Sequence, residues 1–362
     1  MRILFILMGL ILFFKPAKTQ DKSYAIDQAK FHFVERESRK IVNVEGREAL
    51  YLNGKAFLKE VTLADGIVEV DVLAEKKRSF AGLMFRVKDQ VNYEALYLRM
   101  HKSGSADAVQ YNPEFNGEAN WQLYREHQKY AKFDAKKWTH LKIEIQGQQL
   151  KVYIDNAKKP VLEVDHLKLD NAQGFIGFYS FLGSYFTNFR YTTFKDKSGK
   201  VRSVKNAAGI VKEWELSPSM LYKNVNTGLY PGKTALDRIE WVTGKTEPSG
   251  LLPINKYRKK RKAGSFEKNE DEVVWARHTF ESDEEGQRKF YFDYSDNIDL
   301  YFNGRLLFSG KNAFRFKGPM YRGDIHIEGN AVYFNVKKGS NEILCAVTDK
   351  ANGWGLLGKF EE

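Results

Sequence analysis

Short segments in which apolar and polar residues alternate dominate the first half of the chain. This period-two pattern is typical of half-buried β-strands, and almost no segment shows the 3.6-residue period of an amphipathic helix. Many short strands without intervening helices predict a β-sandwich. The predicted strands cover residues 66–72, 82–87, 93–100, 108–111, 121–124, 138–145, 150–154, 175–180 and 185–191.

The alternation resumes after a polar stretch without pattern, residues 196–210. Asn303-Gly304, between two alternating runs, is the strongest short-range signal for a β-hairpin. We therefore predict an all-β protein with two sandwich or jelly-roll domains, residues 21–195 and 211–362, joined by a linker at 196–210. The predicted strands of the second domain are 273–280, 289–294, 298–302, 305–308, 331–336 and 342–347.

The first twenty residues predict export. Arg2 precedes an apolar run at residues 3–14, Lys15-Pro16 ends the run, and small residues follow at the spacing that a signal peptidase reads. A membrane span needs about 20 apolar residues, so this run is too short for one. Residues 1–20 are therefore predicted to be a signal peptide, and the mature protein to be periplasmic or extracellular. The alternative is a buried N-terminal helix or strand.

The composition predicts a large hydrophobic core and no intramolecular disulfide. Hydrophobic residues make up 43% of the chain and aromatic residues 14%, which is enough to build a sizeable core. Cys345 is the single cysteine, so an intramolecular disulfide is excluded. It lies in an apolar run, where a thiol usually acts as a small buried hydrophobe.

The charge of the chain is strongly positive. The formal net charge is +12, or +9 without the three basic residues of the predicted leader (Arg2, Lys15 and Lys18). The densest basic run, Lys256–Lys262, would suggest nucleic acid in an intracellular protein. In an exported protein it favours a solvated loop, or a contact with anionic glycans or lipid headgroups. We expect no nucleic-acid partner.

The predicted strands of the first domain are similar in sequence to those of a known superfamily. They resemble the concanavalin A-like lectin/glucanase superfamily over residues 30–192, and more narrowly the laminin-G-like jelly rolls of secreted bacterial proteins. The resemblance implies the sandwich fold but not a function, because such families include lectins, hydrolases and adhesion modules. The segments that carry it are 81–86 (Ala-Gly-Leu-Met-Phe-Arg), 92–99 (Asn-Tyr-Glu-Ala-Leu-Tyr-Leu-Arg), 138–143, 152–155, 174–178 and 185–189.

The second domain resembles the galactose-binding-like jelly rolls that accompany β-glycosidases. In such modules the hairpin and turn motifs are mainly structural. The family includes sugar binders, and many members only support a neighbouring domain. The segments that carry the resemblance are 294–296, 300–305 (Leu-Tyr-Phe-Asn-Gly-Arg), 336–342 (Val-Lys-Lys-Gly-Ser-Asn-Glu) and 352–355 (Asn-Gly-Trp-Gly).

Three carboxylates are candidate catalytic residues. Glu69 and Asp71 alternate along one predicted strand, similar to the catalytic strand of glucanases in this superfamily, and Glu94 is the third candidate. A retaining glycosidase needs two carboxyl groups about 5–5.5 Å apart, which one strand face can supply. The segment comes early in the domain and lacks nearby tryptophans, so the alternative is an ordinary half-exposed acidic strand.

Strand parity predicts a ligand-binding sheet face. On each strand the apolar residues alternate with a second set that points the other way. Aromatic rings and planar hydrogen-bonding groups suit sugars, and arginine favours carboxylate or sulfate. The alternative is a covered face in which the same residues form a buried polar network. The predicted binding residues are Arg86, Tyr97, Arg99, Gln110, Gln122 and Tyr124, with the loop 111–117 at the rim.

No cofactor motif is present in the sequence. The seven histidines are scattered without paired metal spacing. Asp296 and Asp299 are weak candidates for a structural calcium site, as jelly rolls often hold this ion, but their spacing is not that of a calcium loop.

These patterns favour an exported, carbohydrate-binding protein without its own catalysis, whose ligand is an acidic or neutral polysaccharide. The second hypothesis is a glycoside hydrolase or polysaccharide lyase that uses the carboxylates above. The third is an adhesion or structural module. An enzyme should have paired carboxylates in an open cleft, and a binder should have exposed aromatic residues without such a pair.

Overall fold

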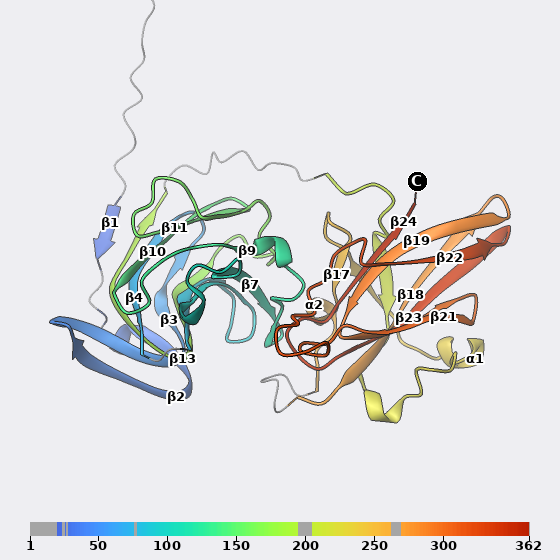
Figure 1. The fold of residues 1–362 in the computed structure, drawn as a ribbon, viewed down its shortest axis with the longest axis horizontal. Helices are drawn as coiled ribbons and strands as arrows, with labels where there is room; N and C mark the ends of the chain where they lie inside the picture. The colour runs from blue at the N-terminus through green and yellow to red at the C-terminus, as the bar shows by residue number, and fades with distance from the viewer. Residues whose placement is uncertain are drawn as a thin grey trace, which may run out of the picture.

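The computed structural model describes residues 20–23, 26, 28–75, 78–194, 205–261 and 269–361, and it is built almost entirely from β-strands. The predicted all-β fold class is confirmed. Figure 1 shows an N-terminal half, blue to green, beside a C-terminal half, yellow to red. Residues 1–19 of the predicted signal peptide and most of the predicted linker lie outside the described residues, and Gln20 begins β1. Among those residues, none of the helices has the length and apolarity that a membrane crossing needs.

The N-terminal half forms two facing layers of one continuous sheet. The strands follow the order β12-β11-β10-β4-β13-β5-β6-β7-β8, with β3 paired to β2 and β13, β1 to β13 and β9 to β7. The strands are β1 Gln20–Ser23, β2 Phe31–Val44, β3 Arg47–Leu63, β4 Gly66–Ala74, β5 Phe80–Val87, β6 Tyr93–Arg99, β7 Val109–Phe115, β8 Glu118–Ala119, β9 Gln128–Lys129, β10 Thr139–Gln146, β11 Gln149–Ile154, β12 Leu162–Val164 and β13 Gly174–Thr193. Three 3₁₀ turns accompany them: η1 Gln28–Lys30, η2 Met100–Lys102 and η3 Arg125–His127.

Strand β13 links the two layers. Its first part pairs with β5 and its second part with β4, and the register shifts between Ser180 and Ser184. At the shift, Leu182 and Gly183 have φ angles of 70° and 82°, a left-handed backbone that turns the strand. Apolar side chains of β4 and β10 meet those of β5 and β6 in one buried cluster. The core of this half therefore lies between the layers.

The C-terminal half is a second sandwich. A sheet in the order β16-β14-β18-β23-β20-β21, with β15 beside β18, faces a sheet in the order β17-β24-β19-β22. Side chains of both sheets, Trp214 and Phe290 among them, form one buried cluster. The strands are β14 Glu213–Leu216, β15 Met220–Leu221, β16 Val242–Lys245, β17 Leu251–Pro253, β18 Glu272–Ser282, β19 Gly286–Ser295, β20 Asn297–Phe302, β21 Arg305–Lys311, β22 Asn330–Val336, β23 Gly339–Asp349 and β24 Gly355–Phe360. The short helices are η4 Tyr222–Asn224, α1 Lys233–Leu236 and α2 Ile254–Tyr257.

Local chemistry explains the hairpin that the sequence predicts. Asn303 and Gly304 join β20 to β21 with φ angles of 47° and 81°, as a type I′ turn requires. A second tight hairpin joins β10 to β11, where Gln146 pairs with Gln149.

Two predicted elements differ from the structure. Residues 121–124 form a turn and not a strand, because the chain leaves the sheet after β8 and bonds to the C-terminal half. The predicted strands 175–180 and 185–191 belong to one long strand, β13. The hairpin of β2 with β3 was not among the predicted elements.

Polar contacts join the two halves. The Asn116 side chain donates to the backbone oxygen of Asn255 (2.8 Å), and the Asn255 amide donates to Asn120 Oδ1 (2.6 Å). The Tyr124 hydroxyl donates to Glu247 Oε1 (2.6 Å), and Lys168 forms an ion pair with the same carboxylate (2.8 Å). The halves therefore pack directly against one another.

Candidate functional site

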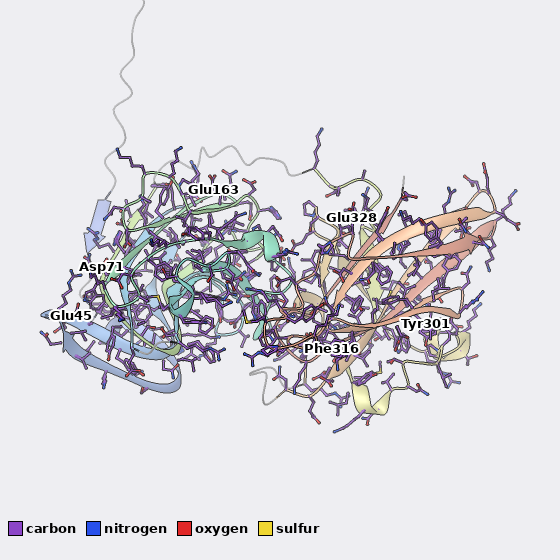
Figure 2. All side chains as sticks on the ribbon, in the orientation of Figure 1. Glu45, Asp71, Glu163, Tyr301, Phe316 and Glu328 are labelled. Atoms are coloured by element: carbon purple, nitrogen blue, oxygen red, sulfur yellow. The ribbon has the colours of Figure 1, made fainter. Side chains whose placement is uncertain are left out.

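A cavity of about 610 Å³ lies between the N-terminal sheet and a loop of the C-terminal half. Residues of β5, β6, β7, β8 and β13 line it on one side, and residues 314–322 with Asn352 line it on the other. Figure 2 labels Phe316, in that loop, where the two halves meet. Its size lies within the range of about 300–1,000 Å³ that is usual for small-molecule sites.

Aromatic side chains of three strands form one wall. Tyr97 of β6 stacks on Tyr179 of β13, with ring centroids 5.3 Å apart. Phe80 of β5 packs edge-on against Tyr97 (5.8 Å) and tilts against Phe181 of β13 (5.6 Å). Neighbouring strands bring these rings together because each residue points to the same sheet face. The wall presents ring surface to the cavity.

Trp121 also lines the cavity and contacts side chains of both halves. Its indole Nε1 donates to Asn352 Oδ1 (3.1 Å), and its ring meets that of Phe314 edge-on at 5.5 Å. The Arg322 guanidinium lies 5.0 Å from the centre of the Trp121 ring, a cation–π distance. The C-terminal half therefore completes the cavity.

Three cationic groups converge on one carboxylate at the cavity wall. Lys102 Nζ lies 2.7 Å from Asp107 Oδ2, Arg99 Nη1 lies 3.9 Å from the same oxygen, and Arg322 Nη1 donates to it as well. Arg99 is further held by the Asp107 backbone oxygen (2.6 Å) and by Gln110 Oε1 (2.9 Å). Burial opposes ionisation of Asp107, but the three cations hold the pKa of this carboxyl below its usual value.

Two further titratable groups line the cavity. Burial lowers the pKa of His101, so its imidazole is neutral at pH 7, and its Nδ1 lies 3.4 Å from the backbone oxygen of Ser79. Glu114 of β7 forms an ion pair with Lys55 (3.0 Å). The two cavity carboxylates, Asp107 and Glu114, are therefore each held by a cation.

Only some residues of the predicted ligand face line the cavity. Tyr97 and Arg99 line the cavity, and Gln110 lies behind them as the acceptor for Arg99. Gln122 instead donates to the backbone oxygens of residues 322 and 323, and Tyr124 bonds to Glu247, so both join the two halves. The predicted rim loop 111–117 continues β7, and Asn112, Glu114 and Gly117 of this segment line the cavity.

Arg86 lies away from the cavity because the backbone bulges beneath it. Its φ angle is 47°, and the register of β5 against β13 shifts between the pairs of Met84 and Val87. A bulge inserts one residue and reverses the parity of those that follow. The guanidinium therefore donates to Gln148 Oε1 (3.0 Å) and to the Gly147 backbone oxygen in the β10–β11 turn.

The predicted catalytic carboxylates do not meet in a cleft. Glu69 and Asp71 flank His140 of β10, with Nε2 3.4 Å from Glu69 and Nδ1 2.7 Å from Asp71. These hydrogen bonds raise the pKa of His140 to about 9. Figure 2 places Asp71 on the side of the N-terminal half away from Phe316. Glu94 is fully buried elsewhere and accepts bonds from the Tyr111 hydroxyl and the backbone nitrogens of residues 168 and 169, and its burial raises its pKa.

The two calcium candidates, Asp296 and Asp299, have different hydrogen-bond partners. Asp296 is buried and accepts from the backbone nitrogen of Lys350 (3.0 Å), and burial together with the charge of Asp349 raises its pKa to about 8. Asp299 accepts from the Ser309 hydroxyl (2.5 Å). Within the described ranges no group of three His, Cys, Asp or Glu residues could hold a metal ion.

The basic run is not a uniformly solvated loop. Lys256 forms an ion pair with Asp170 (2.9 Å), and Arg258 donates to the backbone oxygens of residues 216 and 240. Lys260 is completely buried between Asp349 and Glu118. Lys259 is exposed, and Lys262 lies outside the described residues. Few of the described cations of Lys256–Lys262 are therefore free to contact an anionic surface.

Sequence reasoning missed several cavity residues. Asp107 and Arg322 lie 215 positions apart in the chain, so no local pattern could join them. Trp121 was assigned to the apolar face of a strand that does not form. His101 and Lys102 follow β6 in a 3₁₀ turn, where strand parity does not apply. The one available signal was their closeness in sequence to Tyr97 and Arg99.

Residues 41–194 match the sequence profile of the 3-keto-alpha-glucoside-1,2-lyase-like domain. This range contains all of β3 to β13 and includes the N-terminal wall of the cavity. No protein of curated function matches the chain in sequence.

Solved structures with a similar fold cover about half of the chain. A carbohydrate-binding module, CBM66, from Bacillus subtilis is 20% identical, covering 44% of this chain and 94% of its own, with a TM-score of 0.35. A β-glucanase from Bacillus licheniformis is 14% identical, covering 50% and 100%, with a TM-score of 0.35. A galectin from Caenorhabditis elegans is 11% identical, covering 47% and 100%, with a TM-score of 0.29. The strand pairing of the N-terminal half shows a β-sandwich, and a fold of this kind does not decide between binding and catalysis.

Proposed function

We propose that the protein is an exported carbohydrate-binding protein without its own catalysis, and that its saccharide ligand lies in the cavity between the two halves. The observation that carries the proposal is the cavity itself, in which aromatic rings face a cluster of hydrogen-bonding side chains. Both acidic and neutral polysaccharides are candidate ligands.

The chemistry of the walls supports a sugar. Tyr97, Tyr179 and Trp121 offer ring faces and edges for the apolar C–H surface of a pyranose. Asn112 and Asn352 add amide groups suited to hydroxyls. The volume is in the range that encloses a small oligosaccharide or the end of a polymer.

The C-terminal half has a structural role in this proposal. We infer that residues 211–362 form a galactose-binding-like jelly roll whose loop 314–322 completes a site on the jelly roll of residues 21–195. The two-sheet core around Trp214 supports a sandwich fold for this half. The C-terminal half closes the cavity through the contacts Trp121–Asn352 and Arg322–Asp107. Export follows from the predicted leader.

The test is a glycan array on the purified protein, with and without calcium, followed by mass analysis of the same glycans. We expect binding without cleavage. Trp121→Ala and Tyr179→Ala should each weaken binding at least tenfold, because each removes a ring from the cavity. Tyr333→Ala is the control, because this tyrosine is exposed on β22 of the C-terminal half.

One result would reject the cavity as the site, and another would reject glycan binding itself. If the two cavity variants bind as well as the parent protein while Tyr333→Ala does not, the site lies elsewhere. If no glycan on the array binds, an adhesion or scaffold role replaces the proposal. If glycan binding depends on added calcium, the predicted calcium site is supported. If binding is the same without calcium, that site has no role in glycan binding.

A lyase is the second candidate, and the match of residues 41–194 favours it. A 1,2-lyase acting on a 3-keto-glucoside must remove the C2 proton, which the C3 carbonyl acidifies. The C1–O bond then breaks, a C1=C2 double bond forms, and the substituent leaves as an alcohol after its oxygen takes up a proton. A neutral His101 with Nδ1 directed at Ser79 could take that proton on Nε2. Arg99, Lys102 and Arg322 could stabilise the enolate oxygen.

This activity is tested directly with a 3-keto-glucoside. An active lyase would release the C1 substituent and form an unsaturated ketose product that mass spectrometry detects, and His101→Gln should abolish the reaction. His278→Gln serves as the control, because His278 lies in the C-terminal sandwich on β18. Absence of product with the parent protein would reject the lyase and leave the binding proposal standing.

A further inference from the structure

The charge of the cavity wall is unbalanced. Five cationic side chains and two carboxylates line the cavity. Glu114 is already paired with Lys55, which is not among the lining residues, and His101 is neutral at pH 7. The excess of positive charge is therefore concentrated near Asp107.

The cluster around Asp107 cannot neutralise itself. Arg99, Lys102 and Arg322 share one oxygen of Asp107, and Arg322 also pairs with Asp324 (3.3 Å), so three positive charges meet two negative ones. Arg99 is almost completely buried, whereas the side chains of Lys102 and Arg322 are 31% and 23% exposed. Like charges in a partly desolvated site repel one another unless an anion joins them. The cluster is arranged to accept a further anion.

Arg322 has an unused hydrogen-bond donor. Its Nη1 donates to Asp107 and its Nε to Asp324, while Nη2 is buried and has no partner among the described residues. A buried guanidinium nitrogen without an acceptor is costly, and carboxylate or sulfate is the group that its planar fork fits best.

Two further arginines extend the positive wall. Arg78 and Arg315 line the cavity, and neither forms an ion pair with a described residue. Arg315 lies over the Phe314 ring at 4.9 Å. A second anionic group of a polymeric ligand would therefore meet further cations.

We propose that the saccharide bound in this cavity is acidic, and that a carboxylate or sulfate group on it binds between Lys102 and Arg322 beside Asp107. This inference rests on the proposed binding function. The sugar ring would lie against the aromatic wall of Tyr97 and Tyr179, and the anionic group would replace water at the cationic cluster. Loss of bound counterions makes such binding sensitive to salt.

The test compares matched glycans by calorimetric titration of the full protein. The probes are uronate oligosaccharides, their methyl esters, sulfated oligosaccharides and the unsulfated parents. We expect at least one charged probe to bind at least tenfold more tightly than its uncharged counterpart. Raising the salt concentration from 50 to 500 mM should weaken the binding of that charged probe about fivefold or more. Preference for uronate or for sulfate identifies which of the two anions the cluster binds.

Arg322→Gln should weaken the charged probe at least tenfold while changing the binding of its uncharged counterpart less than twofold. Lys102→Gln is a second variant, in case the first does not fold. Arg305→Gln, on the exposed start of β21, is the matched control. Neutral probes that bind as tightly as charged ones, or that lose as much affinity in Arg322→Gln, overturn the acidic-ligand inference but leave the proposed function. If no probe binds, both are rejected.

Discussion

Two clusters of charged side chains lie where the halves of the protein meet, and their charge balance is opposite. In the cavity cluster, three cations (Arg99, Lys102 and Arg322) surround Asp107, and Asp324 pairs with Arg322 alone, so cations outnumber carboxylates. In the sealed cluster, the single ammonium of Lys260 lies between two carboxylates: it pairs with Asp349 and lies 3.6 Å from Glu118. The Lys260 side chain is 0% exposed, whereas the cavity cluster faces open space.

The difference separates a structural role from a binding role. Lys260 also donates to the Lys350 backbone oxygen (2.9 Å), and Asn269 donates to Glu118, so the sealed cluster is closed by bonds within the protein. Burial lowers the pKa of Lys260, but the charges of Asp349 and Glu118 outweigh this effect, and its pKa is raised overall. The cavity cluster keeps a free donor and a surplus of cations, which leaves it open to a ligand.

Removal of Lys260 should have the largest effect on stability. Lys260→Met leaves two buried carboxylates without their cation, so we expect the free energy of unfolding to fall by about 3–5 kcal/mol. Urea denaturation measures the change. Lys259→Met is the neighbouring exposed control, and we expect it to cost less than about 0.5 kcal/mol. Equal, small effects in both variants would show that the sealed cluster does not hold the halves together.

Removal of the carboxylate from the cavity cluster should act mainly on binding. Asp107→Asn removes the counter-charge of Arg99 and Lys102, while Arg322 keeps Asp324. An acidic glycan should therefore bind about five- to tenfold more tightly, a gain of about 1–1.4 kcal/mol. Calorimetric titration measures this, with Asp283→Asn at an exposed position as the control. Weaker binding of the acidic glycan would mean that Asp107 itself contacts the sugar as a hydrogen-bond acceptor.

The His140 cluster should make stability depend on alkaline pH. Hydrogen bonds to Asp71 and Glu69 raise the pKa of His140 from 6.5 to about 9. Because the folded pKa is higher than the unfolded one, this contribution is complete below pH 6.5 and is lost as the pH rises through about 9. After allowance for solvent screening it amounts to about 1 kcal/mol. Unfolding curves between pH 6 and 10 should show this loss in the parent protein but not in His140→Gln; parallel curves would contradict it.

An exposed ion pair should have the smallest effect. Lys223 and Glu270 lie 2.8 Å apart with side chains 67% and 41% exposed. Lys223→Ala should change the free energy of unfolding by less than about 0.5 kcal/mol, because water and salt screen the pair. Urea denaturation at low and high salt checks this. If Lys223→Ala lowers the free energy of unfolding about as much as Lys260→Met does, buried and exposed charge pairs do not differ as we propose.

The sequence predicted the fold because alternation along each strand is a local property. The same local rule placed Tyr97 and Arg99 on one face of β6, and both line the cavity. It failed at Arg86, where a φ angle of 47° marks a bulge that the pattern does not reveal. It also failed for Gln122, which lies in a turn and bonds to the other half.

The rest of the site could not be predicted, because it depends on contacts between distant parts of the chain. Arg322 joins Asp107 across 215 positions, and Trp121 reaches Asn352 across 231. Lys260 looked like part of a solvated basic loop, and its burial depends on carboxylates at positions 118 and 349. Pairings of this kind arise only when two sandwiches pack together, and strand periodicity carries no information about them.

The most direct test of the account is a crystal structure of the full protein with the tightest-binding glycan from the array. The account predicts a sugar ring against Tyr97 and Tyr179, with loop 314–322 over it and an anionic group at Lys102 and Arg322. A glycan bound elsewhere, beside His140 on the far side of the N-terminal half or on the C-terminal sheets, would contradict the assignment of the cavity as the binding site.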